Sequence, residues 1–295
     1  MRTLLILLVM VLGACAEKSI SDQKTSGSAE NSSAKLAFFM TRPQPTGPAE
    51  LIFDKDHAGV KPENYRKSMD LKMSGSASFG PKALREIAKP LKKNKSTLYV
   101  FDLRQESHGL INDVPVTWYA DRDWANADLN HDEAVRRERR LLGDLRVGDK
   151  IAGQEIKSIE TEESMVRSNG HQYVRLTVTD HVRPVDSEVD RFIQAVRDLP
   201  ENSWIHFHCR AGKGRTTTFM VLYDMLLNAK YVGFDEIIDR NTKLSNDYDV
   251  IAVGDSKEWK YPYQKERAEF VREFYNYAKE NPRGEKMLWS EWVAR

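Results

Sequence analysis

Short runs of apolar residues recur along the chain, and turn-forming residues separate them. Four runs either alternate with polar residues or are rich in β-branched and aromatic residues, which is typical of strands in a sheet. These runs are residues 96–102, 114–119, 173–179 and 204–208. The predicted helices are residues 81–91, about 131–145, one from 186 or 187, 215–227, 235–244 and one ending near 281. Alternating strands and helices predict an α/β layered domain whose ligand lies at the carboxyl ends of the strands.

The first fifteen residues form a separate, mostly apolar segment. Arg2 supplies a positive start, residues 4–12 are mostly apolar, and Leu-Gly-Ala-Cys ends at Cys15. The run is far shorter than the ~20 residues that span a bilayer, so it is interpreted as an export signal. Its end resembles the lipobox of bacterial lipoproteins, which implies that residues 1–14 are removed and Cys15 is lipidated. Because Ala16 is not aspartate, the resemblance also implies an outer-membrane anchor facing the periplasm. The alternative is an ordinary secretory signal.

Changes in composition predict the domain boundaries. Residues 15–36 are rich in Ser, Lys and Glu with almost no large apolar side chains, which predicts a flexible tether. Residues 37–295 are predicted to form one folded domain. Within it, residues 143–170 hold short β-type pieces broken by glycines. We therefore expect a small inserted lobe rich in β-structure there.

The charge and cysteine content limit the possible partners. Among 295 residues, 45 Lys and Arg face 44 Asp and Glu, which leaves a formal net charge of +1. Nucleic-acid binders usually carry a basic excess, so we expect no nucleic-acid partner. We also expect no cofactor and no metal, and the sequence assigns no oligomeric state. The two cysteines are Cys15 and Cys209, so lipidation of Cys15 leaves Cys209 without an intramolecular partner.

The stretch after residues 204–208 carries the clearest chemistry of the chain. It reads His208-Cys209, five residues, Arg215-Thr216, which is the pattern of the phosphate loop of cysteine-dependent phosphatases. A free thiol has a pKa of about 8.5. Inward-pointing N–H groups just before a helix start favour the thiolate. Cys209 is therefore predicted to be the nucleophile that attacks phosphorus.

The other loop residues fit the same chemistry. Gly212 and Gly214 allow the backbone to form an anion-binding nest, and the guanidinium of Arg215 matches two phosphoryl oxygens. Thr216 is predicted to donate its hydroxyl to the sulfur, and His208 to brace the loop. One alternative is a buried structural cysteine. The other is a rhodanese-like sulfur transferase, whose loop seldom carries this Arg-Thr ending.

A general acid is expected upstream on a loop. Asp180 follows the predicted strand 173–179 and precedes Pro184, which stiffens the segment. It is placed to protonate the leaving oxygen and then to activate water. The alternative is a turn or helix-capping aspartate, since the next helix begins near residue 186.

Several stretches together resemble one family, the bacterial protein-tyrosine-phosphatase-like inositol phosphatases, often called cysteine phytases. The matching stretches are 102–109, 118–119, 123–126, 179–182 with Pro184, and 206–217, within a resemblance that covers residue 64 to the C-terminus. The resemblance implies the protein tyrosine phosphatase-like fold. This fold has a central, mixed or parallel sheet of four or five strands flanked by helices, with a small β-rich lobe at one side. It also implies hydrolysis of inositol polyphosphates such as phytate through a phosphocysteine intermediate.

The resemblance further implies a set of substrate contacts. It places Arg66 at the substrate rim, with Lys67 as its alternative, and Asp123 and His181 at the binding site. It also brings two cations, Lys260 and Arg267, to the substrate phosphates. Surface charge is the alternative for each cation. Arg104 and His108, after the strand 96–102, are expected at the active-site edge, and a structural ion pair is an equally supported role for Arg104.

Two departures from the family pattern affect the substrate. Arg210 stands where family members often carry an acidic residue, and Arg183 stands where an aromatic residue is common. The loop Arg210-Ala211-Gly212-Lys213-Gly214 resembles that of phosphoinositide 3-phosphatases, so Arg210 and Lys213 are predicted to oppose phosphates that are not being cleaved. The predicted partner is a polyanionic small molecule. Hydrolysis of phosphoinositides or of phosphotyrosine and other phosphoproteins is the alternative, and a phosphate-binding module without turnover conflicts with the presence of both Cys209 and Asp180.

Overall fold

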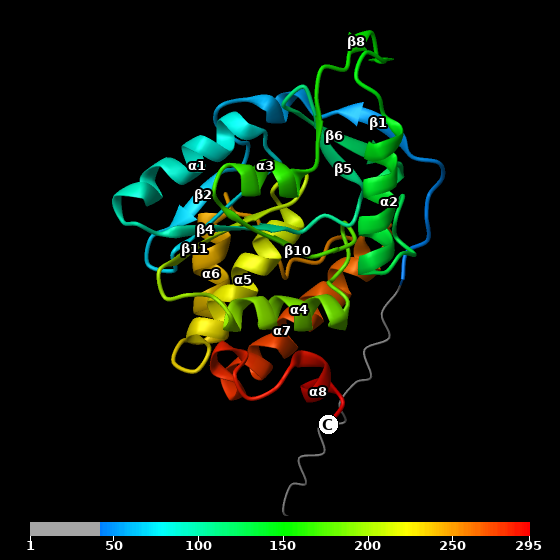
Figure 1. The fold of residues 1–295 in the computed structure, drawn as a ribbon. Helices are drawn as coiled ribbons and strands as arrows, with labels where there is room; N and C mark the ends of the chain where they lie inside the picture. The colour runs from blue at the N-terminus through cyan, green and yellow to red at the C-terminus, as the bar shows by residue number, and fades with distance from the viewer. Residues whose placement is uncertain (1–41) are drawn as a thin grey trace, which may run out of the picture. The chain divides into compact units, whose positions relative to one another are not determined.

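The computed structural model describes residues 42–295 (Figure 1). The predicted signal segment 1–14, the lipidated Cys15 and the tether 15–36 lie outside this range. Contacts between Cα atoms group all the described residues into one unit. Within that range, no helix combines the length and the apolar character that a membrane span requires.

A five-stranded sheet, in the order β10–β4–β11–β3–β2, lies at the centre of the domain. Its strands are β10 (Gln172–Arg175), β4 (Thr97–Asp102), β11 (Ser203–His208), β3 (Met73–Ser76) and β2 (Arg66–Ser68). The first four run parallel, and β2 pairs antiparallel with β3. All six residues of β11 are buried, as expected for a strand covered on both faces. The predicted α/β fold with a mixed sheet of four or five strands is confirmed.

Helices cover both faces of this sheet (Figure 1). One face carries α1 (Pro81–Lys93) and α3 (Glu162–Ser168), which pack with Leu98, Val100 and Trp204 in one apolar cluster. The other face carries the longer helices: α4 (Asp186–Arg197), α5 (Gly214–Asn228), α6 (Phe234–Leu244) and α7 (Tyr261–Glu280), with the short α8 (Trp289–Val293) beyond them.

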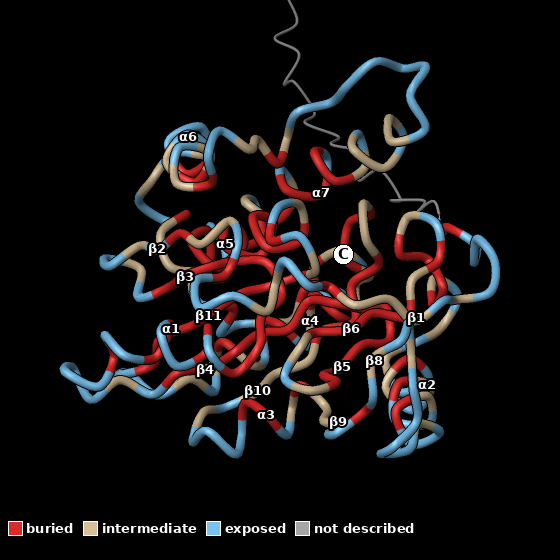
Figure 2. The backbone as a smooth tube through the Cα atoms, turned by 90° about the horizontal axis from the view of Figure 1, so that it is seen from above, coloured by how far each residue is buried: buried red, intermediate tan, exposed pale blue. Residues whose placement is uncertain are grey.

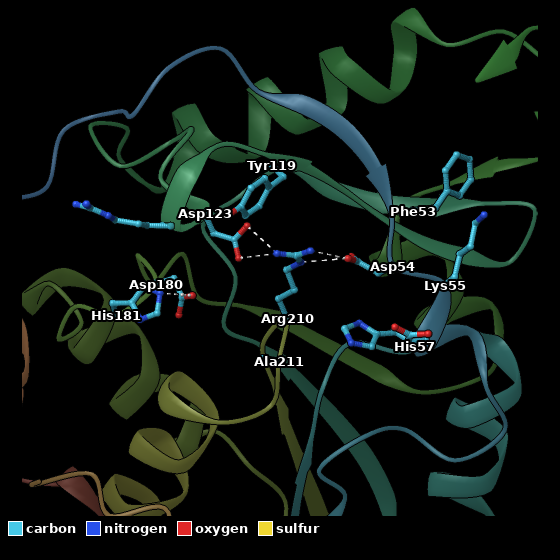
Figure 3. A pocket seen from close by; sticks show the side chains of 12 residues that line it. Phe53, Asp54, Lys55, His57, Tyr119, Asp123, Asp180, His181, Arg210 and Ala211 are labelled. Carbon is cyan, nitrogen blue, oxygen red and sulfur yellow. Dashed lines mark hydrogen bonds and ion pairs between the residues drawn. The ribbon is translucent and has the colours of Figure 1, made fainter. Parts of the chain in front are cut away.

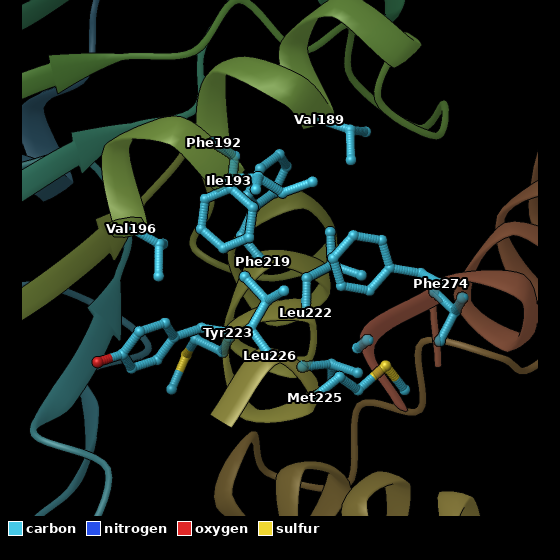
Figure 4. Close-up of a cluster of buried hydrophobic side chains, with 14 of the residues drawn as sticks. Val189, Phe192, Ile193, Val196, Phe219, Leu222, Tyr223, Met225, Leu226 and Phe274 are labelled. Carbon is cyan, nitrogen blue, oxygen red and sulfur yellow. The ribbon is translucent and has the colours of Figure 1, made fainter. Parts of the chain in front are cut away.

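Helix α5 lies at the centre of the larger core. Its residues 215–226 are all buried, so it is surrounded by protein on every side, as the deep red of this region in Figure 2 shows. Figure 4 shows Phe219 and Leu222 of α5 between Phe192 of α4 and Phe274 of α7. Each such aromatic or leucine side chain stabilises the fold by about 1.5–3 kcal/mol on burial. The start of α5, which follows the predicted phosphate loop, is therefore anchored in the core.

A second, antiparallel sheet flanks the first, in the order β1–β6–β5–β9. Its strands are β1 (Glu50–Phe53), β6 (Val114–Tyr119), β5 (His108–Ile111) and β9 (Ile159–Glu160), and α2 (His131–Asp144) contributes Leu142 to their apolar cluster. Three short 3-10 helices, η1 (Lys55–Ala58), η2 (Asp121–Asp123) and η3 (Pro282–Gly284), complete the elements.

The structure distributes the β-rich lobe differently from the prediction. Residues 143–170 hold only the hairpin β7 (Lys150–Ile151) and β8 (Gln154–Glu155), the short β9 and helix α3. The long strands of the second sheet come from residues 50–53 and 108–119. β5 and β6 form a local hairpin, and β1 joins β6 from a distant part of the chain, so the glycine-broken stretch did not indicate this sheet.

Candidate active site

The loop from Cys209 to Lys213 joins β11 to α5 at the carboxyl ends of the parallel strands. Gly212 has a φ of +71°, and a Cβ atom there would lie 2.2 Å from the backbone nitrogen of Ala77. Only glycine is compatible with both constraints. Cys209 is 2% exposed, and Thr216 Oγ1 donates a hydrogen bond to its Sγ at 3.2 Å. The thiol thus lies at the bottom of the loop with the predicted hydroxyl partner beside it.

Arg66 supports this loop from behind. Its Nη2 donates to Thr217 Oγ1 at 2.8 Å, its Nη1 donates to the Gly212 carbonyl, and its side chain is 7% exposed. The expected place at the substrate rim is therefore corrected, because strand alternation turns Arg66 inward. Its alternative, Lys67, is exposed on β2 and lines neither of the two cavities described below.

A buried carboxylate fixes the guanidinium of Arg215. Glu106 Oε2 lies 2.6 Å from Nη1 of Arg215, and Nη2 of Arg215 donates to Oε1 at 3.0 Å. Arg104 pairs with the same carboxylate through Nε at 2.9 Å. Burial alone raises the pKa of Glu106, but Arg215 and Arg104 outweigh it and hold the pKa well below its ordinary value. Arg104 therefore takes the structural role that the sequence left open.

Asp180 faces the same guanidinium from the loop that follows β10. Its Oδ1 lies 3.1 Å from Nε of Arg215, and its Oδ2 lies 3.3 Å from Nε2 of His181. The strand β10 ends at Arg175 rather than at residue 179 because its partner β4 ends at Asp102, opposite Arg175. Residues 176–180 therefore run as a loop that carries Asp180 to the thiol.

A cavity of about 250 Å³ opens above the thiol, and we call it the thiol cavity. Its lining residues are Asp180, His181, Val182, Cys209, Ala211, Lys213, Gly214, Arg215, Thr218, Tyr248, Lys260, Gln264 and Arg267. Arg267 is held in place: its Nε donates to the Val250 carbonyl at 2.9 Å, and its Nη1 donates to the Tyr248 hydroxyl at 3.3 Å. The structure thus brings Lys213, Lys260 and Arg267 together with the loop.

A second, larger cavity of about 660 Å³ adjoins the first, and we call it the outer cavity (Figure 3). It shares Asp180, His181 and Ala211 with the thiol cavity. Its remaining lining residues are Phe53, Asp54, Lys55, Asp56, His57, Tyr119, Arg122, Asp123 and Arg210.

Arg210 lines the outer cavity, whereas Lys213 lines the thiol cavity. It lies between two carboxylates, with Nη2 donating to Asp54 Oδ1 at 2.9 Å and Nη1 lying 3.4 Å from Asp123 Oδ1 (Figure 3). Its guanidinium also stacks over Tyr119 at 5.0 Å. Burial and the nearby Glu106 raise the pKa of Asp123 to about 7, although Arg210 opposes them. Two of the predicted substrate contacts, Arg210 and Asp123, are therefore paired with each other.

A buried network of charges lies behind His208. Glu162 Oε1 lies 2.6 Å from His208 Nε2, and His108 Nε2 lies 3.0 Å from Asp102 Oδ2. Burial and Arg104 lower the pKa of His108, but the carboxylates of Asp102 and Glu138 outweigh them and raise it to about 9. His108 is thus part of this network and not of the cavity lining.

Three residues of this network could offer ligand atoms to a metal ion, and donors of the protein already contact one of them. One ligand atom each from Asp102, His108 and Glu162 lies within 4.8 Å of the others. However, Arg175 Nη1 donates to Asp102 Oδ2 at 2.7 Å, and the Tyr173 hydroxyl donates to the same oxygen at 2.5 Å. Asp102 Oδ2 therefore already accepts two hydrogen bonds from the protein.

The sequence prediction missed several partners of the predicted residues. Glu106 pairs with Arg215, Asp54 with Arg210, and Glu162 with His208, at sequence separations of 109, 156 and 46 residues. No local pattern signals such partners. Arg183, which departs from the family pattern, is 3% exposed and its Nη1 donates to Asp186 Oδ1 at 2.9 Å.

Comparisons with known proteins agree with this geometry. A family model named PTP-like phytase, whose description is 'Inositol hexakisphosphate', matches residues 131–227. A solved PTP-like phytase from Bdellovibrio bacteriovorus is 80% identical with a TM-score of 0.86, over 88% of this chain and 99% of that one. A PTP-like myo-inositol phosphatase from Mitsuokella multacida, solved with myo-inositol-(1,3,4,5)-tetrakisphosphate, is 32% identical with a TM-score of 0.76, over 86% of this chain and 50% of that one.

Effector protein hopD2 of Pseudomonas syringae pv. tomato is a further relative. It is 34% identical over 216 residues, which are 67% of this chain and 46% of the effector. This chain therefore spans about half the length of that effector and of the Mitsuokella protein.

Proposed function

Because the chain belongs to the family of PTP-like phytases, we propose that it hydrolyses phosphomonoesters of inositol polyphosphates, phytate among them. The observation that carries the proposal is the thiol cavity, where Cys209 lies among Lys213, Lys260 and Arg267. A monophosphate needs only the loop and Arg215. The additional cations suit a substrate that carries several phosphates.

The first chemical step transfers the phosphoryl group to sulfur. The Cys209 thiolate attacks phosphorus while the loop N–H groups and Arg215 bind the phosphoryl oxygens. The phosphorus–oxygen bond to the inositol breaks, and the leaving oxygen takes its proton from Asp180. The ion pair between Arg215 and Asp180 at 3.1 Å supports this assignment, because the carboxyl lies beside the guanidinium that would bind the phosphoryl oxygens.

The second step releases phosphate. Asp180, now a carboxylate, accepts a proton from water as the water oxygen attacks the phosphocysteine. The phosphorus–sulfur bond breaks, and the hydroxyl of Thr216, 3.2 Å from Sγ, stabilises the departing thiolate. Inorganic phosphate leaves and the enzyme returns to its initial state without a cofactor.

A substrate panel with two variants tests the proposal. Phosphate release from inositol hexakisphosphate should exceed release from soluble phosphoinositide head groups and from a phosphotyrosine peptide, compared as kcat/KM. Cys209→Ser should abolish turnover of all three, because the serine hydroxyl is not ionised near neutral pH. Inositol hexakisphosphate should still bind to Cys209→Ser in calorimetry. A preference for the phosphotyrosine peptide would favour the alternative, and turnover by Cys209→Ser would reject the thiolate mechanism.

We further propose that the protein is an exported lipoprotein, anchored at Cys15 and facing the periplasm. The support is the Leu-Gly-Ala-Cys stretch that ends at Cys15 after the apolar run. Expression in a Gram-negative host with a radiolabelled fatty acid should label the wild-type chain and leave Cys15→Ser unlabelled. Equal labelling of both chains would reject the anchor.

A further inference from the structure

The loop that carries Asp180 has few backbone hydrogen bonds between its own residues. Val178 N donates to the Leu176 carbonyl at 3.0 Å, and Val182 N reaches the Thr179 carbonyl only at 3.4 Å. His181 has a φ of +66°, a conformation that is uncommon for residues other than glycine. Contacts with other segments must therefore hold Asp180 in front of Arg215.

Trp124 supplies such a contact. Its indole Nε1 donates a hydrogen bond to the backbone carbonyl of Asp180 at 2.9 Å, and its side chain is 3% exposed. The residues just before it, Arg122 and Asp123, have φ values of +63° and +59°. This turn aims the indole at the loop from the side of the second sheet.

Trp259, at the start of the segment that leads into α7, covers the same place from outside. Its ring meets Trp124 edge-to-face at a centroid distance of 5.7 Å and His181 at 5.1 Å. The guanidinium of Arg122 lies 4.1 Å from the Trp259 ring and 5.1 Å from the Trp124 ring. Tyr263 of α7 packs on Trp124 at 5.4 Å. Two segments that are distant in sequence, residues 122–124 and 259–263, thus meet over the Asp180–His181 backbone.

We propose that Trp124 is a positioning residue that holds the general acid in place through its bond to the Asp180 carbonyl. Trp259 and Arg122 keep the indole in this orientation. The proposal rests on the proposed role of Asp180. Trp124 lines neither the thiol cavity nor the outer cavity, so it acts through Asp180 and not on the substrate.

The test is Trp124→Phe, which keeps an aromatic ring and removes the N–H donor. A misplaced acid should lower kcat for inositol hexakisphosphate, a poor leaving group, by about 10- to 100-fold. It should change kcat for p-nitrophenyl phosphate, which needs little protonation, by less than about 2-fold.

Trp292→Phe is the matched control. Trp292 lies in the C-terminal helix α8, and its indole Nε1 donates to Glu280 Oε2 of α7 at 2.7 Å, so this variant also loses an indole hydrogen bond, away from the Asp180 loop. This variant should leave both substrates unchanged. If Trp124→Phe does not unfold cooperatively on heating, Trp259→Ala is assayed in its place. Trp259 is 38% exposed, so its replacement should disturb the core less. It should show the same selective loss, about 3-fold or more.

The Asp180→Asn variant separates the positioning role of Trp124 from the acid role of Asp180. In Asp180→Asn, adding Trp124→Phe should cause no further loss, because the acid is already absent. A further selective loss in that background would overturn the positioning role, as would equal losses on both substrates in Trp124→Phe. Equal losses on both substrates in Asp180→Asn itself would instead reject Asp180 as the acid.

Discussion

The two cavities share a wall but differ in charge. Four basic side chains line the thiol cavity with Asp180 as their one carboxylate, whereas the outer cavity sets Lys55, Arg122 and Arg210 against four aspartates. In the outer cavity Arg210 is already paired with Asp54 and Asp123. This difference shows that the charge a cavity offers to a polyanion depends on the carboxylates that the fold places beside each cation, and not on the cations alone.

Replacing Asp180, which lines both cavities, should have the largest effect on kcat. Asp180→Asn keeps the shape of the side chain and removes the proton donor, so kcat for inositol hexakisphosphate should fall by about 10²–10⁴-fold. Turnover of p-nitrophenyl phosphate should fall far less. Asp123→Asn, on the outer side, serves as the comparison in the same assay. If it caused the same selective loss, the acid would belong to the outer cavity.

Single cations should then distinguish the two cavities. Lys213→Met removes from the thiol cavity a charge that has no ion pair within residues 42–295, and it should raise KM for inositol hexakisphosphate by about 3- to 10-fold. The double change Arg210→Met with Asp54→Asn removes one charge of each sign, so KM should change by less than about 2-fold. Both effects should shrink at high salt. A larger KM effect from the double change would show that Arg210 binds substrate.

The smallest effect should be on the pH dependence of stability. The pKa of Asp123 is raised to about 7, above the ~3.9 of an unfolded aspartate. Its contribution to stability is therefore fully present below the unfolded pKa and is lost as the pH rises through about 7. The Tm of the wild type relative to Asp123→Asn should fall by a few degrees between pH 5 and 8. A constant difference would mean that Asp123 stays ionised throughout.

Local patterns predicted the fold and the catalytic loop well. The strands around residues 97–102 and 203–208 and the helix that starts at residue 81 lie where the pattern placed them, give or take one or two residues. The loop from Cys209 to Thr216 is contiguous in sequence, so its spacing encodes its geometry. The sequence predicted too late an end for strand β10, because the alternation of apolar and polar residues continues to Thr179 after the paired strand β4 has ended.

The supporting partners were beyond prediction for a different reason. The family resemblance placed Arg66 at the substrate rim, yet the fold places it behind Gly212. The resemblance of the loop to that of phosphoinositide 3-phosphatases assigned Arg210 to a substrate phosphate, yet the fold pairs it with Asp54. In each case the partner that decides the role lies more than a hundred residues away.

These long separations also affect how the site forms. Arg66 meets Thr217 across 151 residues, and Arg210 meets Asp54 across 156. Contacts of this kind close late in folding, because the entropy of a long loop is lost before the contact is made. Helices such as α1 need only their own residues to begin. During refolding from denaturant, the helical signal should therefore recover before enzymatic activity does, and synthesis of the chain must pass Thr217 before both contacts can form.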